Sequence, residues 1–343
     1  MAQSPTWQGI PASTVVIVPF KDDFGALARC LASLLPSLPA GARVIVIDDG
    51  SCEDPAADPT LAPLLAHRAV VALRHQVNRG PSAARNSGFA WCRENGVDTV
   101  ILLDSDCVAP PDFVTLHLAH HHEHPEAIGV GCAIEGTGVG FWAYFDRMMS
   151  WFTSVPRADC VIAPPYHAPT TNLSFKLRPD RRQLLAFPER LRTGEDVALF
   201  RRLARAGEIV RFSTLPAIVH FDRTTFAAVL RHQYRWGLHT FFVRSGRLDA
   251  PLLARAAFAL AFIPLAPAYA ALTTWLTMRL WLPRHRRDWP FLPLVYLTYL
   301  VKAVAVAHGA LVPAAALYPD EGRAGPHPAS DYAPSSHRSA RIV

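Results

Sequence analysis

The sequence predicts an α/β protein with a doubly wound, mixed and mainly parallel sheet that is followed by C-terminal hydrophobic helices. Short β-branched runs alternate with amphipathic helical segments in the first third of the chain. This alternation is typical of parallel sheets with helices on both faces. The last third contains two long apolar stretches instead. The 343 residues are enough for one sizeable α/β core and a further region.

The elements follow from the periodicity of apolar residues. The run at 15–18 is β-branched and bounded by Pro19, which predicts a buried strand. At 25–35 apolar residues recur at helical spacing, which predicts an amphipathic helix. The same reasoning predicts strands at 44–47, 69–73, 100–103, 127–134, 171–177, 209–212 and 217–221, and helices at 81–95, 113–124 and 195–206.

Acidic residues follow two of the predicted strands. Asp48-Asp49-Gly50-Ser51 comes after 44–47, and Asp104-Ser105-Asp106 comes after 100–103. Ligands of doubly wound sheets bind beyond the carboxyl ends of the strands. Asp104 and Asp106 can both reach a divalent cation there, and their hard oxygens suit Mg²⁺ or Mn²⁺. An ordinary turn remains the alternative for such a triplet.

The charge balance restricts the partners. The chain has 34 Lys and Arg against 28 Asp and Glu, and 18% of its residues are charged. This modest excess, almost all of it Arg, does not indicate nucleic acid but suits phosphate ligands or an anionic membrane surface. The six cysteines form no CxxC pair, which predicts buried free thiols in a reducing compartment and no structural zinc site.

Further motifs complete a pattern. Asn78-Arg79-Gly80 and Ala84-Arg85-Asn86 flank the start of a predicted helix, and Gly194-Glu195-Asp196 opens another. With the two acidic motifs, the sequence over about 13–240 resembles the family 2 glycosyltransferases. The resemblance implies the glycosyltransferase A-type nucleotide-diphospho-sugar transferase fold. It also implies metal-dependent transfer of a sugar, with inversion, from a nucleotide-diphospho-sugar.

The resemblance assigns expected roles on the donor side. It makes Asp49 a contact to the base with help from Arg85, and Asp104 a contact to ribose or sugar hydroxyls. Apart from the resemblance, Arg231 and Arg235 lie four residues apart on a predicted helix and are expected to meet the leaving diphosphate or a lipid phosphate, with a basic face beside the membrane as their alternative. The residues expected to shape the nucleoside pocket are Pro19, Phe20 and Asp22.

The resemblance also implies acceptor and metal residues. Asp196 would be the general base and Glu195 would bind the acceptor, although carboxylates in a first helical turn also interact well with the helix dipole. Asp106 would bind the metal together with His220, for which a core histidine is the alternative. We expect the histidines between 117 and 124 to form a solvated helix face rather than a metal site.

The predicted function is therefore non-processive transfer of a hexosyl or related group to a glycan or lipid-linked acceptor at a membrane. Gln233-Tyr234-Arg235-Trp236 is one residue short of the Gln-x-x-Arg-Trp motif of processive synthases. The stretch 185–192 lacks the Gly-Gly-Phe-Asp-Glu type sequence that usually precedes the acidic pair, which leaves the acceptor type open. Two alternatives are a catalytically silent sugar-nucleotide-binding or scaffold protein and a nucleotidyltransferase on a related sheet.

The C-terminal region predicts membrane association. The stretch 256–278 has no charge and is long enough to cross a bilayer, and 289–317 is long enough too but contains Lys302. Spanning is the favoured prediction, and an interfacial hairpin is the alternative. Thr298, Lys302 and Gly309 share one helical face, which is expected to pack against the first stretch. The chain has no recognisable signal peptide, so the catalytic domain is expected in the cytoplasm.

The predicted domain organisation has four parts. They are an N-terminal extension at 1–12, the catalytic domain at 13–240, two hydrophobic membrane-associated helices at 241–318 and a disordered tail at 319–343.

Overall fold

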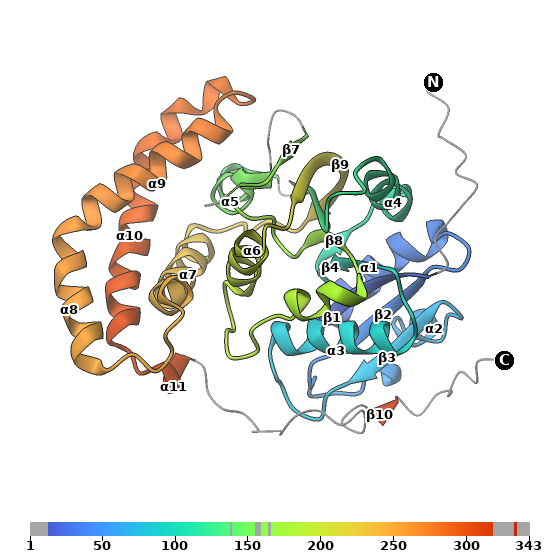
Figure 1. Ribbon diagram of the computed structural model, residues 1–343. Helices are drawn as coiled ribbons and strands as arrows, with labels where there is room; N and C mark the ends of the chain where they lie inside the picture. The colour runs from blue at the N-terminus through green and yellow to red at the C-terminus, as the bar shows by residue number, and fades with distance from the viewer. Residues whose placement is uncertain (1–12, 138, 155–158, 164–165, 318–332, 335–343) are drawn as a thin grey trace.

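The computed structural model describes residues 13–137, 139–154, 159–163, 166–317 and 333–334. A single mixed sheet forms the centre of the molecule, and its strands follow the order β10-β3-β2-β1-β4-β8-β6-β9-β5, with β7 beside β9. The C-terminal helices stand apart on one side of it (Figure 1). The predicted extension at 1–12 lies outside the described residues. So does the predicted tail, except that β10 (Ala333–Pro334) pairs with β3.

The first half of the sheet is parallel and confirms the predicted strand–helix alternation. β1 pairs in parallel with both β2 and β4, and β2 pairs in parallel with β3. The bounds of these elements are β1 Thr14–Phe20, α1 Phe24–Leu34, β2 Arg43–Asp48, α2 Ala62–Leu65, β3 Val70–Arg74, α3 Pro81–Glu94 and β4 Thr99–Leu103.

The second half is mixed. β8 runs antiparallel to both β4 and β6, whereas β6 and β9 are parallel. The sheet is thus mixed and mainly parallel, and the predicted fold class is confirmed. The bounds are β5 Cys107–Val108, α4 Phe113–Glu123, β6 Gly129–Gly136, α5 Phe141–Trp151, β7 Cys160–Val161, β8 Asn172–Lys176, α6 Glu195–Arg205 and β9 Val210–His220.

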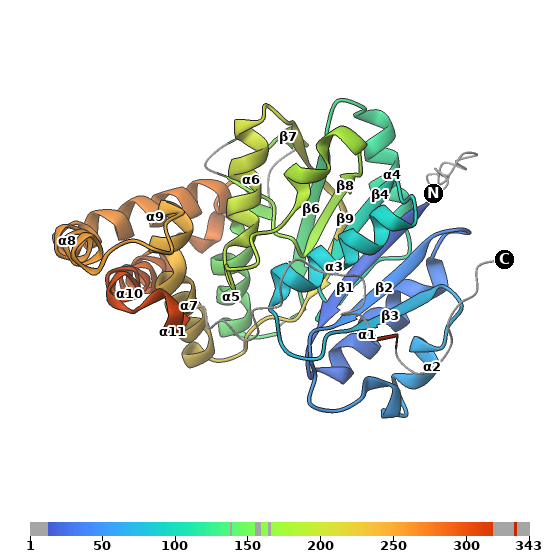
Figure 2. The same cartoon turned by 60° about the horizontal axis from the view of Figure 1, so that its bottom comes forward.

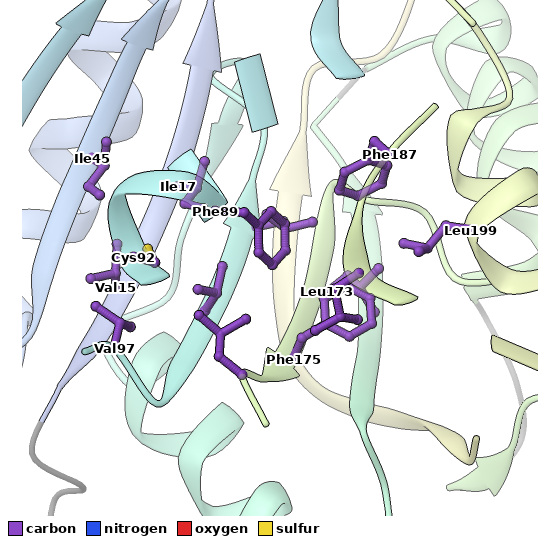
Figure 3. Close-up of a cluster of buried hydrophobic side chains, with 14 of the residues drawn as sticks. Val15, Ile17, Ile45, Phe89, Cys92, Val97, Leu173, Phe175, Phe187 and Leu199 are labelled. Carbon is purple, nitrogen blue, oxygen red and sulfur yellow. The ribbon is translucent and has the colours of Figure 1, made fainter. Parts of the chain in front are cut away.

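Helices cover both faces of the sheet, because the strands are apolar on both sides (Figure 2). On one face, Phe89 and Cys92 of α3 and Leu199 of α6 pack on Ile17, Phe175 and other buried side chains (Figure 3). On the opposite face, side chains of α1 and α4 pack against the alternate residues of β1, β2 and β4. The helices on the two faces hold the sheet in place, and with it the edge at which the acidic motifs lie.

Several sequence predictions for the middle of the chain need correction. The two strands predicted at 209–212 and 217–221 are one strand, β9, whose pairing with β6 shifts in register between Cys132 and Ile134. Helix α5 was not predicted. It begins at Phe141 and supplies aromatic side chains that pack against the C-terminal helices.

Two histidines of α4 do not belong to the predicted solvated face, although His122 is exposed as predicted. His117 and His121 are buried and both bond to Ser174 Oγ at 2.9 Å, and His117 also bonds to Asn172 at 2.9 Å. Burial lowers the pKa of each of these two imidazoles to about 3. They are neutral parts of the packing between α4 and β8.

All six cysteines are free thiols, as predicted. Four are buried, but Cys52 and Cys160 are exposed, which corrects the prediction for these two. Cys52 lies in the turn after β2, and Cys160 lies in the short edge strand β7. The burial that the apolar residues near them in the sequence predict is therefore wrong for these two thiols.

The last third of the described chain is helical. It consists of α7 Phe226–Ser245, α8 Leu252–Phe262, α9 Ala266–Trp281, α10 Leu292–Leu311 and α11 Ala314–Leu317. Two helical stretches, Leu252–Trp281 and Arg286–Leu311, are long and apolar enough to cross a membrane. α7 continues through residue 240, the predicted domain boundary. Lys302 and Gly309 face α7 rather than the first apolar stretch, which corrects the expected packing.

Candidate active site

A cavity of about 420 Å³ opens at the carboxyl ends of β1, β2 and β4, the edge where the sequence predicted ligand binding. Parallel strands bring their carboxyl ends to the same edge, so residues distant in the sequence meet there. Its lining is Pro19, Phe20, Lys21, Asp23, Asp49, Asn78, Gly80, Pro81, Ala84, Arg85, Asp104, Ser105, Asp106 and Arg192.

The loop after β1 is fixed to the turn after β2. Asp22 has a positive φ of 62°. Its carboxylate accepts a hydrogen bond from the Cys52 backbone N–H at 2.8 Å, and its own N–H donates to Ser51 Oγ at 2.9 Å. Asp22 therefore holds the loop after β1 against the turn after β2 but lies outside the cavity lining, whereas Pro19 and Phe20 belong to it.

Asp49 fixes the start of α3. Its Oδ1 accepts hydrogen bonds from the Arg79 N–H at 2.9 Å and pairs with His75 Nδ1 at 2.7 Å, and its Oδ2 accepts from the Gly80 N–H at 2.7 Å. Gly80 has a φ of 90°, and a Cβ there would meet the Arg192 side chain. Asp49 lines the cavity, but its carboxylate oxygens already accept hydrogen bonds from the backbone N–H groups of Arg79 and Gly80.

Arg85 is the centre of a buried ionic chain. Its two Nη atoms donate to Glu195 Oε1 at 2.7 Å and to Asp104 Oδ1 at 2.8 Å. The other Asp104 oxygen accepts from Thr171 Oγ1 at 2.8 Å. Burial lowers the pKa of Arg85, but the charges of Asp104 and Glu195 raise it more, so Arg85 stays charged. This chain joins the carboxyl end of β4 to the first turn of α6.

We expect Arg85→Met to destabilise the full chain by about 3–5 kcal/mol, because it leaves the buried Glu195 carboxylate without its cation and also removes the partner of Asp104. Arg93→Met, near the end of the same helix, is the matched control and should change the free energy of unfolding much less. Urea unfolding of both purified variants measures the difference. Equal losses for Arg85→Met and Arg93→Met would contradict a central role for the ionic chain.

The acidic pair at the start of α6 has two different environments. Burial raises the pKa of Glu195 to about 7, Arg85 opposes this shift, and the charge of Asp196 adds to it. Asp196 pairs with His167 Nε2 at 3.4 Å and accepts from the Val197 N–H at 2.7 Å. Burial would raise the pKa of Asp196, but His167 and the backbone hold it below its usual value. Asp196 is therefore the ionised and the less buried member of the pair.

Asp106, Cys107 and His220 bring their ligand atoms within 4.8 Å of one another. Asp106 Oδ2 lies 3.3 Å from His220 Nε2, and the imidazole packs edge-on against Trp151. Burial would lower the pKa of His220, but the charge of Asp106 raises it above its usual value. Burial raises the pKa of the Cys107 thiol, so Cys107 stays protonated. The oxygen and imidazole donors match a hard or borderline divalent cation.

The structure brings most of the predicted site residues together. Arg85 links Glu195 to the cavity, and Asp106 links His220 to it. Arg235 is an exception, since it is exposed on α7 and lies outside the cavity lining. Residues of the site that the sequence did not indicate are Thr171, His167, Arg192, Cys107 and Trp151.

The stretch 185–192, which departs from the family pattern, still folds onto the site. The side-chain amide of Asn86 donates through its nitrogen to the Phe187 carbonyl and to Glu189, and its oxygen accepts a hydrogen bond from the Phe187 N–H. Asn78 accepts from Arg192 Nη1 at 2.8 Å. Asn78 and Asn86 belong to the motifs Asn78-Arg79-Gly80 and Ala84-Arg85-Asn86. These polar side chains were the only sequence feature that indicated contacts with the stretch 185–192.

Comparisons with known proteins agree with this geometry. The model of the family described as glycosyl transferase family 2 matches residues 15–187, half of the chain. A pre-mycofactocin glycosyltransferase of Mycobacterium tuberculosis is 29% identical over 213 residues, 61% of this chain and 43% of that protein. The succinoglycan biosynthesis protein ExoO of Rhizobium meliloti is 27% identical over 244 residues, 66% of each chain.

A solved structure of GalNAc-T7 with UDP, GalNAc and Mn²⁺ matches with a TM-score of 0.47 and 15% identity, over 68% of this chain and 51% of that chain. The chain spans less than half the length of the mycobacterial relative. The family model covers β1 to β8 with all residues of the cavity lining up to Asp106. By this match and by the acidic site at the end of its sheet, the chain belongs to glycosyl transferase family 2.

Proposed function

We propose that the protein is an inverting, metal-dependent glycosyltransferase that moves a sugar from a nucleotide-diphospho-sugar to a membrane-proximal or lipid-linked acceptor. The observation that supports this most is the chain Asp104–Arg85–Glu195, which connects the cavity to the acidic pair of α6. The names of the relatives, which include a glycosyltransferase, agree with sugar transfer.

The cavity is the proposed donor site. Pro19 and Phe20 present an apolar wall to the base, and Asp49 stands beside them. Arg192 and Lys21 add positive charge to the lining, which favours a diphosphate. In this proposal Asp104 meets ribose or sugar hydroxyls with the part of its carboxylate that Arg85 and Thr171 leave free.

Asp106 and His220 are the proposed metal ligands. Their oxygen and nitrogen donors fit Mg²⁺ or Mn²⁺, and the imidazole favours Mn²⁺ of the two. When bound, the cation would neutralise charge on the diphosphate as it leaves. Half of the Asp106 side chain is exposed, so this carboxylate can also reach a ligand in the cavity.

Asp196 is the proposed general base. It is ionised at neutral pH and 20% of its side chain is exposed, so it can accept the proton of an acceptor hydroxyl during in-line attack. Glu195 is buried against Arg85 and would position Asp196 and the acceptor rather than take the proton. We assign this chemistry to residues 13–240 and acceptor delivery to the helices of 241–318, with the catalytic part in the cytoplasm.

A screen of nucleotide sugars tests the proposal, with release of nucleoside diphosphate by the purified full chain as the readout. We expect release from one or a few donors, and loss of this release when a chelator removes the divalent metal. Release that a chelator does not change would contradict the metal-dependent mechanism. A folded protein that releases nothing from any common donor would support a silent sugar-nucleotide-binding protein.

A further inference from the structure

The outermost surface of the C-terminal region is a long apolar strip. It consists of the exposed side chains of α8 and α9; α8 lies at the end of the molecule away from the sheet in both views (Figures 1 and 2), and α9 continues from it. Leu253 is 82% exposed, Leu265 59% and Trp275 54%. Between 252 and 278 the one charged residue, Arg255, is buried and donates to carbonyls at the end of α10. Between 252 and 278 the strip is therefore uncharged, and the exposed Arg279 marks its end.

The second apolar stretch is attached to the catalytic part at both of its ends. At its start, Phe291 stacks on Phe145 of α5, and Asp288 accepts hydrogen bonds from Tyr144 of α5 and from Trp281. At its far end, Leu317 of α11 packs on the cluster that contains Leu191. The 20 residues of α10 separate these two contacts by about 30 Å.

The middle of α10 also contacts the catalytic part, through α7. Lys302 Nζ lies 3.4 Å from Gln233 Oε1 and 5.1 Å from the ring centroid of Trp236, both on α7. Gly237 and Gly309 let the two helices approach closely, because a Cβ on Gly309 would overlap the backbone of Leu238. Lys302 thus points to the catalytic part and away from the strip.

These attachments conflict with a spanning arrangement. If α10 crossed the bilayer, its ends would lie on opposite sides of the ~30 Å hydrocarbon core, and the catalytic part in contact with both ends would enter that core. The exposed Arg231 and Arg235 of α7 would enter with it. Each arginine near the bilayer centre costs at least about 2.5 kcal/mol.

We propose that α8, α9 and α10 form an in-plane membrane anchor that does not cross the bilayer, with the strip inserted in the headgroup–acyl boundary. The occupant is an anionic lipid surface, because Arg279 lies over the ring of the exposed Trp275, and the exposed Arg284, Arg286 and Arg287 follow the end of α9. This proposal does not depend on the reaction, since it rests on packing outside the active site.

A depth profile along the strip tests the proposal. Leu253, Leu265 and Trp275 are each replaced by cysteine in a Cys52→Ser, Cys160→Ser background, whose remaining cysteines are buried. A nitroxide is attached, and its depth is measured by power saturation in vesicles of phosphatidylethanolamine and phosphatidylglycerol. An in-plane anchor gives the same shallow depth, about 5–10 Å below the headgroups, at all three positions.

A spanning helix predicts a different profile. Leu265 is 12 residues from Leu253 and 10 from Trp275, so it would lie about 15 Å deeper than both. That result would overturn the proposal. A nitroxide on Asp112→Cys, exposed beside α4, is the aqueous control. No lipid contact at any position, with dimers in detergent-free solution, would overturn it in favour of a second copy covering the strip.

Discussion

Replacing Asp196 by asparagine (Asp196→Asn) is expected to lower kcat by about 10²–10⁴ while the affinity for the donor stays nearly unchanged. Asparagine keeps an oxygen that accepts the Val197 N–H, so the first turn of α6 should remain intact. It has no basic carboxylate, so the acceptor hydroxyl would lose its proton acceptor. Steady-state kinetics together with donor calorimetry separate the two effects.

Two comparisons make this test specific. Asp112→Asn removes an exposed carboxylate at the start of α4 and should leave both kcat and donor affinity unchanged. His167→Gln removes the partner of Asp196 and should lower kcat less than Asp196→Asn does, because the carboxylate remains. A parallel loss of donor affinity and kcat in Asp196→Asn would instead give Asp196 a structural role.

We expect Asp106→Ala to weaken metal-dependent donor binding by more than about 100-fold, because the diphosphate charge loses its cation and the cation loses an oxygen ligand. Isothermal calorimetry with a nucleoside diphosphate, with and without Mn²⁺, measures the effect. In the absence of metal, Asp106→Ala and the native chain should bind with similar, weak affinity.

Asp112→Ala is the control for this second prediction, since it also removes one carboxylate but lies outside the cavity lining. It should keep the full increase in affinity on addition of Mn²⁺. An unchanged Mn²⁺ effect in Asp106→Ala would show that the cation is bound elsewhere. The buried His117 and His121 would not be the place, because both already bond to Ser174.

The sequence by itself determined the parallel half of the sheet and the edge at which the site lies. Strands such as 15–18 and 100–103 are apolar on both faces, so their short-range composition alone identifies them. The acidic motifs at Asp49 and Asp104 follow such strands directly. Their place at one edge is then a consequence of parallel pairing.

Tertiary structure decided which groups meet and how each carboxylate is used. Asp49 holds the Arg79–Gly80 backbone, and Arg85 joins Glu195 to Asp104 across 110 and 19 residues of sequence. Local periodicity contains no information on such pairs, because hydrogen-bond partners depend on loop paths. The same holds for His167 and Thr171, which no motif indicated.

The C-terminal helices show most clearly the difference between what the sequence determines and what only the tertiary structure decides. Length and hydropathy identified two apolar stretches but could not distinguish a spanning helix from one that lies in the membrane plane. The distinction lies in what the ends of α10 contact, Phe145 at one end and the Leu191 cluster at the other. These contacts join residues more than a hundred positions apart, and only the packed fold brings them together.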